Sequence, residues 1–109
     1  MDIQPEELPL ACVMDAIKLE DRPQYDALRG WLEQSAVEIR ELPNGYGFSL
    51  MLESDTLVKL AEFVSLERLC CPFLNFVIEV EPGQRAVWLR MTGRDGVREF
   101  LTEELGLTR

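Results

Sequence analysis

The sequence predicts an α+β domain in which two β-hairpin–helix units form a four-stranded antiparallel sheet with helices packed on it, preceded by an N-terminal helix. Four short runs alternate apolar and polar residues and are joined in pairs by proline-glycine turns, and three longer runs repeat apolar residues at helical spacing. With 109 residues, the chain has the size of one ordinary domain. We therefore expect residues 1–109 to form a single domain, with residues 1–9 as a loose lead-in.

The first helix is expected from about Arg22 to Gln34. Asp21 can serve as its N-cap, and Gln24 stands at the capping-box position. A short apolar stretch before it, residues 10–14, could form an edge strand. The predicted buried face of this helix carries Tyr25, Leu28, Trp31 and Leu32.

Two hairpins are predicted from alternation around the turns Pro43-Asn44-Gly45 and Pro82-Gly83. One face of each hairpin should be apolar and turned toward the core. The side chains expected on that face are Val37, Ile39, Phe48, Leu50 and Leu52 in the first hairpin and Phe76, Ile78, Val80, Val87, Leu89 and Met91 in the second.

A second helix should begin after Ser54 or Asp55 and end at Cys70 or Cys71, because Pro72 disfavours helical geometry in the residue before it. The apolar residues of this helix form a stripe that is wider than one helix face, which suggests burial on two sides. Its main members are expected to be Leu57, Leu60, Ala61 and Val64, widened by Phe63, Leu66, Leu69 and Cys70.

A third helix is expected after Thr92-Gly93, with Gly106 in the position of a terminating glycine. Free amides at its start could suggest an anion site, but Asp95 would repel an anion, so we interpret this stretch as a helix cap. The apolar residues of this helix are Val97, Phe100, Leu101 and Leu105.

The second face of the sheet is predicted to be half polar. The first helix, a strand from the N-terminal stretch or a second copy of the protein could cover this face, and the last option would make a homodimer. Trp88 would mark a partner surface unless the first helix covers it. The residues expected there are Glu38, Arg40, Ser49, Met51, Val77, Glu79, Trp88 and Arg90.

Composition excludes several classes of function. The chain has 20 acidic and 11 basic side chains, and its net charge of −9 disfavours nucleic acid and anionic membranes as partners. It has no run of apolar residues that could span a membrane, and its N-terminus is acidic where a signal peptide would be basic, so a cytoplasmic protein is expected. Because histidine is absent and no nucleophile and base are recognisable, an enzyme is the less favoured interpretation.

The sequence contains three cysteines, Cys12, Cys70 and Cys71, an odd number that does not suit a disulfide scaffold. The run Glu67-Arg68-x-Cys70-Cys71-Pro72-Phe73-x-x-Phe76, with the later Pro82-Gly83 turn, resembles a group of small bacterial proteins without an established function. The resemblance extends over residues 10–106 and includes the Leu-Ala-Cys setting of Cys12. Such proteins are occasionally encoded near heavy-metal resistance functions. The resemblance therefore implies a connection with metal ions, but it implies no activity and identifies no catalytic residues.

The chemistry of these side chains suggests a soft-metal site. Cys70 and Cys71 offer two thiolates, Cys12 could supply a third, and Glu67 can share their helical face. Three sulfurs and one carboxylate would complete a tetrahedral zinc shell, and copper(I) or mercury(II) are further candidates. The site is therefore predicted to bind or sense a soft metal ion through thiols.

A second interpretation stays open. Free cysteine is among the most buried residue types, so all three thiols could simply fill the core. The protein would then be a non-catalytic, homodimeric interaction module with structural cysteines. The distance from the sulfur of Cys12 to those of Cys70 and Cys71 decides whether the three could share an ion.

Overall fold

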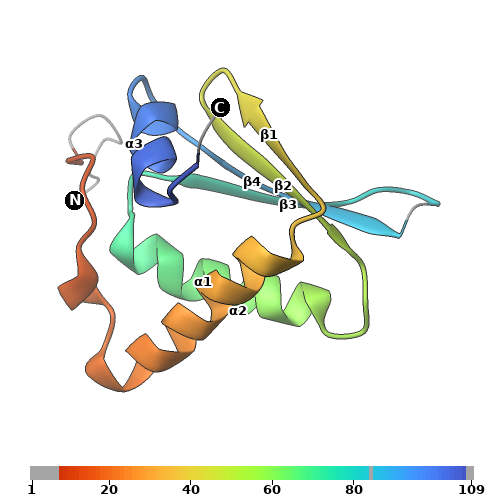
Figure 1. Ribbon diagram of the computed structural model, residues 1–109. Helices are drawn as coiled ribbons and strands as arrows, with labels where there is room; N and C mark the ends of the chain where they lie inside the picture. Colours follow the sequence, from red (N-terminus) through yellow and green to blue (C-terminus); the bar gives the residue numbers. More distant parts are fainter. Residues whose placement is uncertain (1–7, 84, 108–109) are drawn as a thin grey trace, which may run out of the picture.

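The computed structural model describes residues 8–83 and 85–107, and it confirms the predicted fold class. Figure 1 shows a four-stranded antiparallel sheet with three helices, the first of which precedes the strands. Apart from residues 8 and 9, the expected lead-in lies outside the described residues. The elements are α1 (Arg22–Ser35), β1 (Glu38–Leu42), β2 (Gly45–Met51), α2 (Thr56–Cys70), β3 (Asn75–Val80), β4 (Ala86–Thr92) and α3 (Val97–Glu104).

The two hairpins lie side by side in the strand order β1-β2-β4-β3, so β2 and β4 form the centre of the sheet. Every neighbouring pair is antiparallel. In the central pair, Phe48 is opposite Leu89 and Leu50 is opposite Val87. These four side chains are buried in the core, as their alternation predicted.

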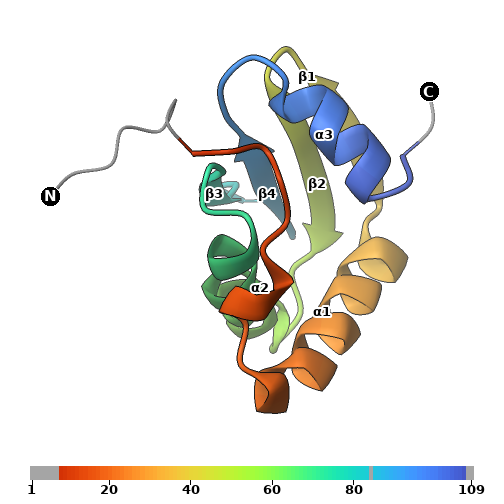
Figure 2. The ribbon, with the colours of Figure 1, turned by 90° about the vertical axis from the view of Figure 1, so that its left-hand side faces the viewer.

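The helices pack against this apolar face. In Figure 1, α1 and α2 lie side by side below the strands, and α3 lies farther along the sheet. Figure 2 shows the same layers from the side. All three helices contribute to one buried cluster with the central strands, for example through Leu28, Phe63 and Leu101. The molecule therefore has a single core between the sheet and its helical layer.

Burial on the two edge strands differs from the prediction. The register places Ile39 opposite Phe48 and Ile78 opposite Leu89, so both have the expected orientation. Their exposed fractions are nevertheless 45% and 38%, and Val37 is 69% exposed. Alternation indicates which face a side chain takes, but the helices cover the central strands more fully than the edge strands.

The helical faces are also shifted from the prediction in α2. Leu57 and Ala61, expected in the main stripe, are exposed. The buried positions of α2 are Thr56, Leu60, Phe63, Glu67 and Cys70. The helix is thus rotated so that a carboxylate and a thiol, rather than Leu57 and Ala61, face the interior.

Capping of the helices is simpler than expected. Asp21 and Asp55 take the N-cap positions of α1 and α2, but neither side chain donates or accepts a capping hydrogen bond. The predicted capping-box role of Gln24 is wrong, because its amide nitrogen donates to Glu62 of α2 at 2.7 Å. At the end of α3, Gly106 has a φ of +64°, which confirms its role as terminating glycine.

Trp88 lies on the face of the sheet opposite the helices, in one row with Glu38, Ser49 and Glu79. It is nevertheless only 7% exposed. The guanidinium groups of Arg40 and Arg90 lie 4.7 and 5.6 Å from its ring centroid, and its indole N–H donates to Glu81 at 2.7 Å. Neighbouring cations therefore shield the tryptophan, and the partner surface stays a prediction.

The close approach of β2 and β4 provides a test of the sheet. A Cβ added at Gly45 would lie 2.0 Å from the backbone oxygen of Met91, whereas one at Gly30 in α1 would meet nothing within 4 Å. We expect Gly45→Ala to lower the free energy of unfolding by about 2 kcal/mol or more, because backbone must shift. Gly30→Ala, the control, should raise it by about 0.5–1 kcal/mol through helix propensity. Urea denaturation measures both, and a neutral Gly45→Ala would contradict the observed register.

Candidate metal centre

The candidate site begins where α2 ends. Cys70 is the last residue of the helix, and Cys71 leaves the helical region with φ −125° and ψ 73° ahead of Pro72, as predicted. The amide of Cys71 still donates to the carbonyl of Glu67 at 2.7 Å. Both cysteines are almost fully buried, with exposed fractions of 0% and 2%. The helix end therefore presents two adjacent thiols inside the protein.

The segment that carries Cys12 runs beside this helix end. Figure 2 shows the chain after residue 8 passing the C-terminal end of α2 before it turns toward α1. Its contact is a hydrogen bond from the amide of Val13 to the carbonyl of Cys70, 2.8 Å long. Residues 10–14 do not form the edge strand that was considered for them; they are irregular up to a 3-10 turn at Met14–Ala16. The segment fails to join the sheet because it packs at the helix end instead.

The three sulfur atoms form a compact group. Cys12 Sγ and Cys71 Sγ are 3.8 Å apart. All three sulfurs, including that of Cys70, lie within 4.8 Å of one another. Cys12 is partly exposed, whereas the other two are buried. The structure thus brings together the three thiols that the sequence nominated, and their spacing is compatible with metal binding.

Glu67 lies beside this group, as its position on the last turns of α2 predicted. The residue is 4% exposed, and its carboxylate accepts hydrogen bonds from Tyr25 Oη at 2.9 Å and from Cys71 Sγ at 3.6 Å. Both bonds reach the same oxygen, Oε1. Burial raises the pKa of Glu67 even though these donors oppose the shift.

Glu104 is the site residue that sequence reasoning missed. It is the last residue of α3, 92 positions after Cys12, and its Oε1 accepts a hydrogen bond from Cys12 Sγ at 3.0 Å. Arg29 of α1 holds this carboxylate by an ion pair of 3.6 Å and donates a further hydrogen bond to the backbone carbonyl of Glu104. The only available signal was its place three residues after the buried Leu101, which puts it at the border of the apolar stripe.

The surroundings favour the protonated forms of Cys12 and Cys71. Burial, followed by the hydrogen bond to Glu104, raises the pKa of Cys12 to about 12. Burial and the negative charge of Glu67 also raise the pKa of Cys71. A carboxylate that accepts a thiol's hydrogen bond stabilises the protonated form. Cys12 and Cys71 are therefore neutral, weakly nucleophilic thiols at neutral pH.

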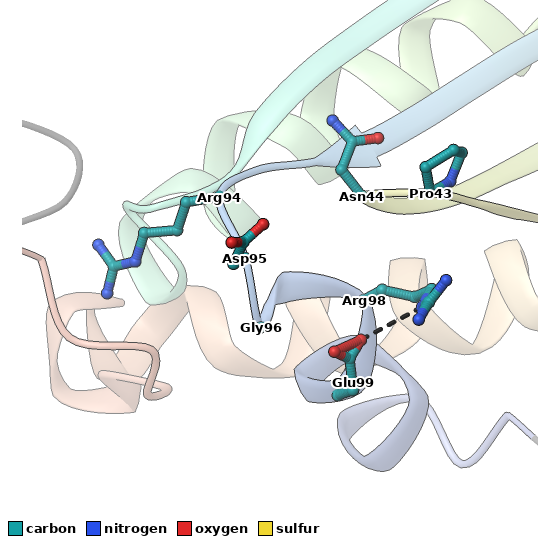
Figure 3. Close-up of a pocket in the computed structure, with 7 residues that line it drawn as sticks. All are labelled: Pro43, Asn44, Arg94, Asp95, Gly96, Arg98 and Glu99. Atoms are coloured by element: carbon teal, nitrogen blue, oxygen red, sulfur yellow. Dashed lines mark hydrogen bonds and ion pairs between the residues drawn. The ribbon is translucent and has the colours of Figure 1, made fainter.

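A surface pocket elsewhere does not share these features. Figure 3 shows it at the start of α3, lined by Asn44, Arg94, Asp95 and other polar residues. Arg98 in this pocket pairs with Glu99 at 3.2 Å, so acidic groups lie among its cations. Gly96, in the stretch interpreted as a helix cap, is the N-cap of α3, and no side-chain hydrogen bond contributes to this cap. The thiol cluster is the stronger candidate site.

Comparisons with protein-family models, curated proteins and solved structures found no match to this chain. Within residues 8–83 and 85–107, none of the helices is long and apolar enough to cross a membrane. The chemistry of the thiol cluster is accordingly the basis for any statement on function.

The raised pKa of Cys12 predicts an unusual pH profile. The pKa of Cys12 moves from an ordinary value of 9.0 to about 12, so the thiolate fraction, and with it the alkylation rate by iodoacetamide, should keep rising tenfold per pH unit past pH 9. Mass spectrometry of the Cys12 peptide between pH 7 and 10.5 measures this rate. Glu104→Gln should speed alkylation at each pH, because the anionic acceptor is gone. Glu103→Gln, at the exposed neighbour, is the matched control. A wild-type rate that levels off near pH 9 would contradict the description of the site.

Proposed function

We propose that the protein binds, and thereby senses, a soft metal ion through Cys12, Cys70 and Cys71, with Glu67 as a carboxylate ligand. The observation that carries the proposal is the mutual approach of the three sulfurs to within 4.8 Å. Zinc–sulfur bonds of about 2.3 Å in a tetrahedral shell separate two ligating sulfurs by about 3.8 Å. The sulfurs of Cys12 and Cys71 lie 3.8 Å apart, which equals that separation.

The position of Glu67 supports a fourth ligand of carboxylate type. In the same tetrahedral shell, with a zinc–oxygen bond of about 2.1 Å, a sulfur and an oxygen ligand lie about 3.6 Å apart. Glu67 Oε1 is 3.6 Å from Cys71 Sγ. Tyr25 would then act as the outer partner that orients this carboxylate through its hydroxyl.

Charge favours a divalent ion over copper(I). Three thiolates and one carboxylate carry four negative charges in a largely buried space, and such charges are costly unless they are neutralised. A divalent cation neutralises two of them and a monovalent one neutralises a single charge, while Arg29 lies at the border of the site beside Glu104. Zinc or mercury(II) therefore suits the site better than copper(I), and its ligands must lose their thiol protons on binding.

Titration with cadmium(II), a spectroscopic stand-in for zinc and mercury(II), tests the proposal. We expect sulfur-to-metal charge-transfer absorption that saturates at one ion per chain. Each of Cys12→Ser, Cys70→Ser and Cys71→Ser should weaken binding by more than about tenfold, because each removes a ligand. Glu67→Gln should also weaken it, whereas Glu62→Gln on the same helix is the matched control.

Thermal unfolding provides a second readout. Cadmium(II) at 100 times its dissociation constant should add about 2.7 kcal/mol to the free energy of unfolding of the wild type. If the wild type, with all its thiols reduced, shows neither the absorption nor the added stability, the proposal is wrong. The interpretation with purely structural cysteines predicts that result, together with a loss of stability in the serine variants.

A further inference from the structure

We propose that Cys12 and Cys71 are also an oxidation site, at which hydrogen peroxide forms a disulfide between them. We select this pair because Cys12 Sγ and Cys71 Sγ are only 3.8 Å apart. A disulfide needs about 2.05 Å, so the sulfurs must approach by about 1.8 Å. Cys12 lies in an irregular segment rather than in a helix or strand, so this movement requires no helix or strand to break. The consequence of this bond for metal binding rests on the proposed function, because both concern the same three thiols.

The burial of the three thiols sets the order of events. Cys12 is partly exposed, whereas Cys70 and Cys71 are almost fully buried at 0% and 2%. An oxidant from solvent therefore meets Cys12 first, and Cys71 completes the bond from inside. A direct bond between the adjacent Cys70 and Cys71 would need a strained ring.

The charge of the protein selects the class of oxidant. The chain has a net charge of −9, and Glu104 stands next to the Cys12 sulfur. Anionic oxidants such as glutathione disulfide are repelled by this environment, whereas hydrogen peroxide is small and neutral. Hydrogen peroxide is therefore the class of oxidant that suits the surroundings of Cys12.

The reaction balances in two steps. The Cys12 thiol loses its proton and the thiolate attacks one peroxide oxygen; because burial raises the pKa of Cys12, this thiolate is scarce at neutral pH and the step is slow there. The O–O bond breaks, the released hydroxide takes up the proton, and a sulfenic acid and one water result. The Cys71 sulfur then attacks the Cys12 sulfur, the S–O bond breaks, and the disulfide and a second water form. The two sulfurs lose two electrons and the peroxide gains them, and both thiol hydrogens leave in the waters. A dithiol reductant reverses the bond.

The consequence for the site is mutual exclusion. The disulfide would remove two of the three thiolates that hold the ion, leaving Cys70 alone. Conversely, a bound ion would hold Cys12 and Cys71 as thiolate ligands and protect them from oxidation. Metal and peroxide thus compete for the same pair of sulfurs.

Peptide mapping after peroxide treatment of the reduced, metal-free chain tests the inference. Trypsin places Cys12 in residues 1–18 and both other cysteines in residues 69–85, so the bond joins two peptides with the loss of two hydrogens. We expect this cross-link in the wild type and in Cys70→Ser, and its absence in Cys12→Ser and Cys71→Ser. Prior loading with cadmium(II) should reduce it at least tenfold, and dithiothreitol should remove it.

The outcomes separate the two proposals. If the wild type gives no cross-link, or if Cys71→Ser still gives it, the inference is wrong, while cadmium(II) absorption can still support the proposed function. If the cross-link forms but the reduced chain binds no cadmium(II), the proposed function fails and the oxidation site stands. An oxidised chain that binds cadmium(II) as tightly as the reduced one would overturn the mutual exclusion.

Discussion

The carbonyl group of Cys70 at the buried end of α2 needs a hydrogen-bond donor, and the donor it obtains positions the candidate site. The last carbonyls of a helix have no partner within the helix, and leaving one unpaired in the interior costs free energy. Here the amide of Val13 supplies the bond at 2.8 Å. Because Cys12 directly precedes Val13, this backbone bond brings its thiol beside Cys71. The thiol cluster is thus a consequence of how the helix end is satisfied.

The polar groups around the sulfurs form a second layer that this arrangement requires. A carboxylate such as Glu67, which is 4% exposed, is costly to bury unless it is paired or protonated. Tyr25 and Cys71 both donate to it, and among the described residues no buried side-chain nitrogen or oxygen lacks a partner. Purely structural cysteines would account for the small volume at Cys70 and Cys71. They would not account for the buried carboxylate of Glu67 beside them, because an apolar residue at that position would cost less free energy to bury.

The sequence predicted local structure well and the coverage of surfaces poorly. Pro72 limits the residue before it whatever the tertiary context, so the end of α2 was predicted correctly. The exposure of Ile39 and Ile78 could not be predicted, because alternation gives the face of a strand but not the extent of the helical layer over it. The rotation of α2, which exposes Leu57, follows from packing against α1 and the sheet rather than from any local pattern.

The sequence predicted the three thiols of the candidate site but not its second carboxylate, Glu104, because sequence patterns indicate local proximity and not tertiary contacts. Glu67 and Cys70 lie in the last turn of α2 and Cys71 follows directly, with its amide still bonded to the carbonyl of Glu67, so local geometry fixes their proximity. Cys12 could be nominated from thiol chemistry, but residues 8–13 have no periodic pattern from which to place them. Glu104 is 92 positions from Cys12, and nothing in the last turn of a short helix indicated that a tertiary contact would bring it to the sulfur.

The same geometry determines where a bound ion would act on the protein. Cys70 and Cys71 belong to the helix end and are fixed by the core. Cys12 belongs to an irregular segment that is held by a backbone hydrogen bond from Val13 to α2, by a hydrogen bond from Arg94 to the carbonyl of Leu8 and by the bond of the Cys12 thiol to Glu104. Ligation would therefore change the segment far more than the helix, because free energy released on binding stabilises whichever element is least stable without it. A disulfide to Cys71 would tie down the same segment without an ion. A bound ion or a disulfide would thus affect the rest of the molecule chiefly through residues 8–13.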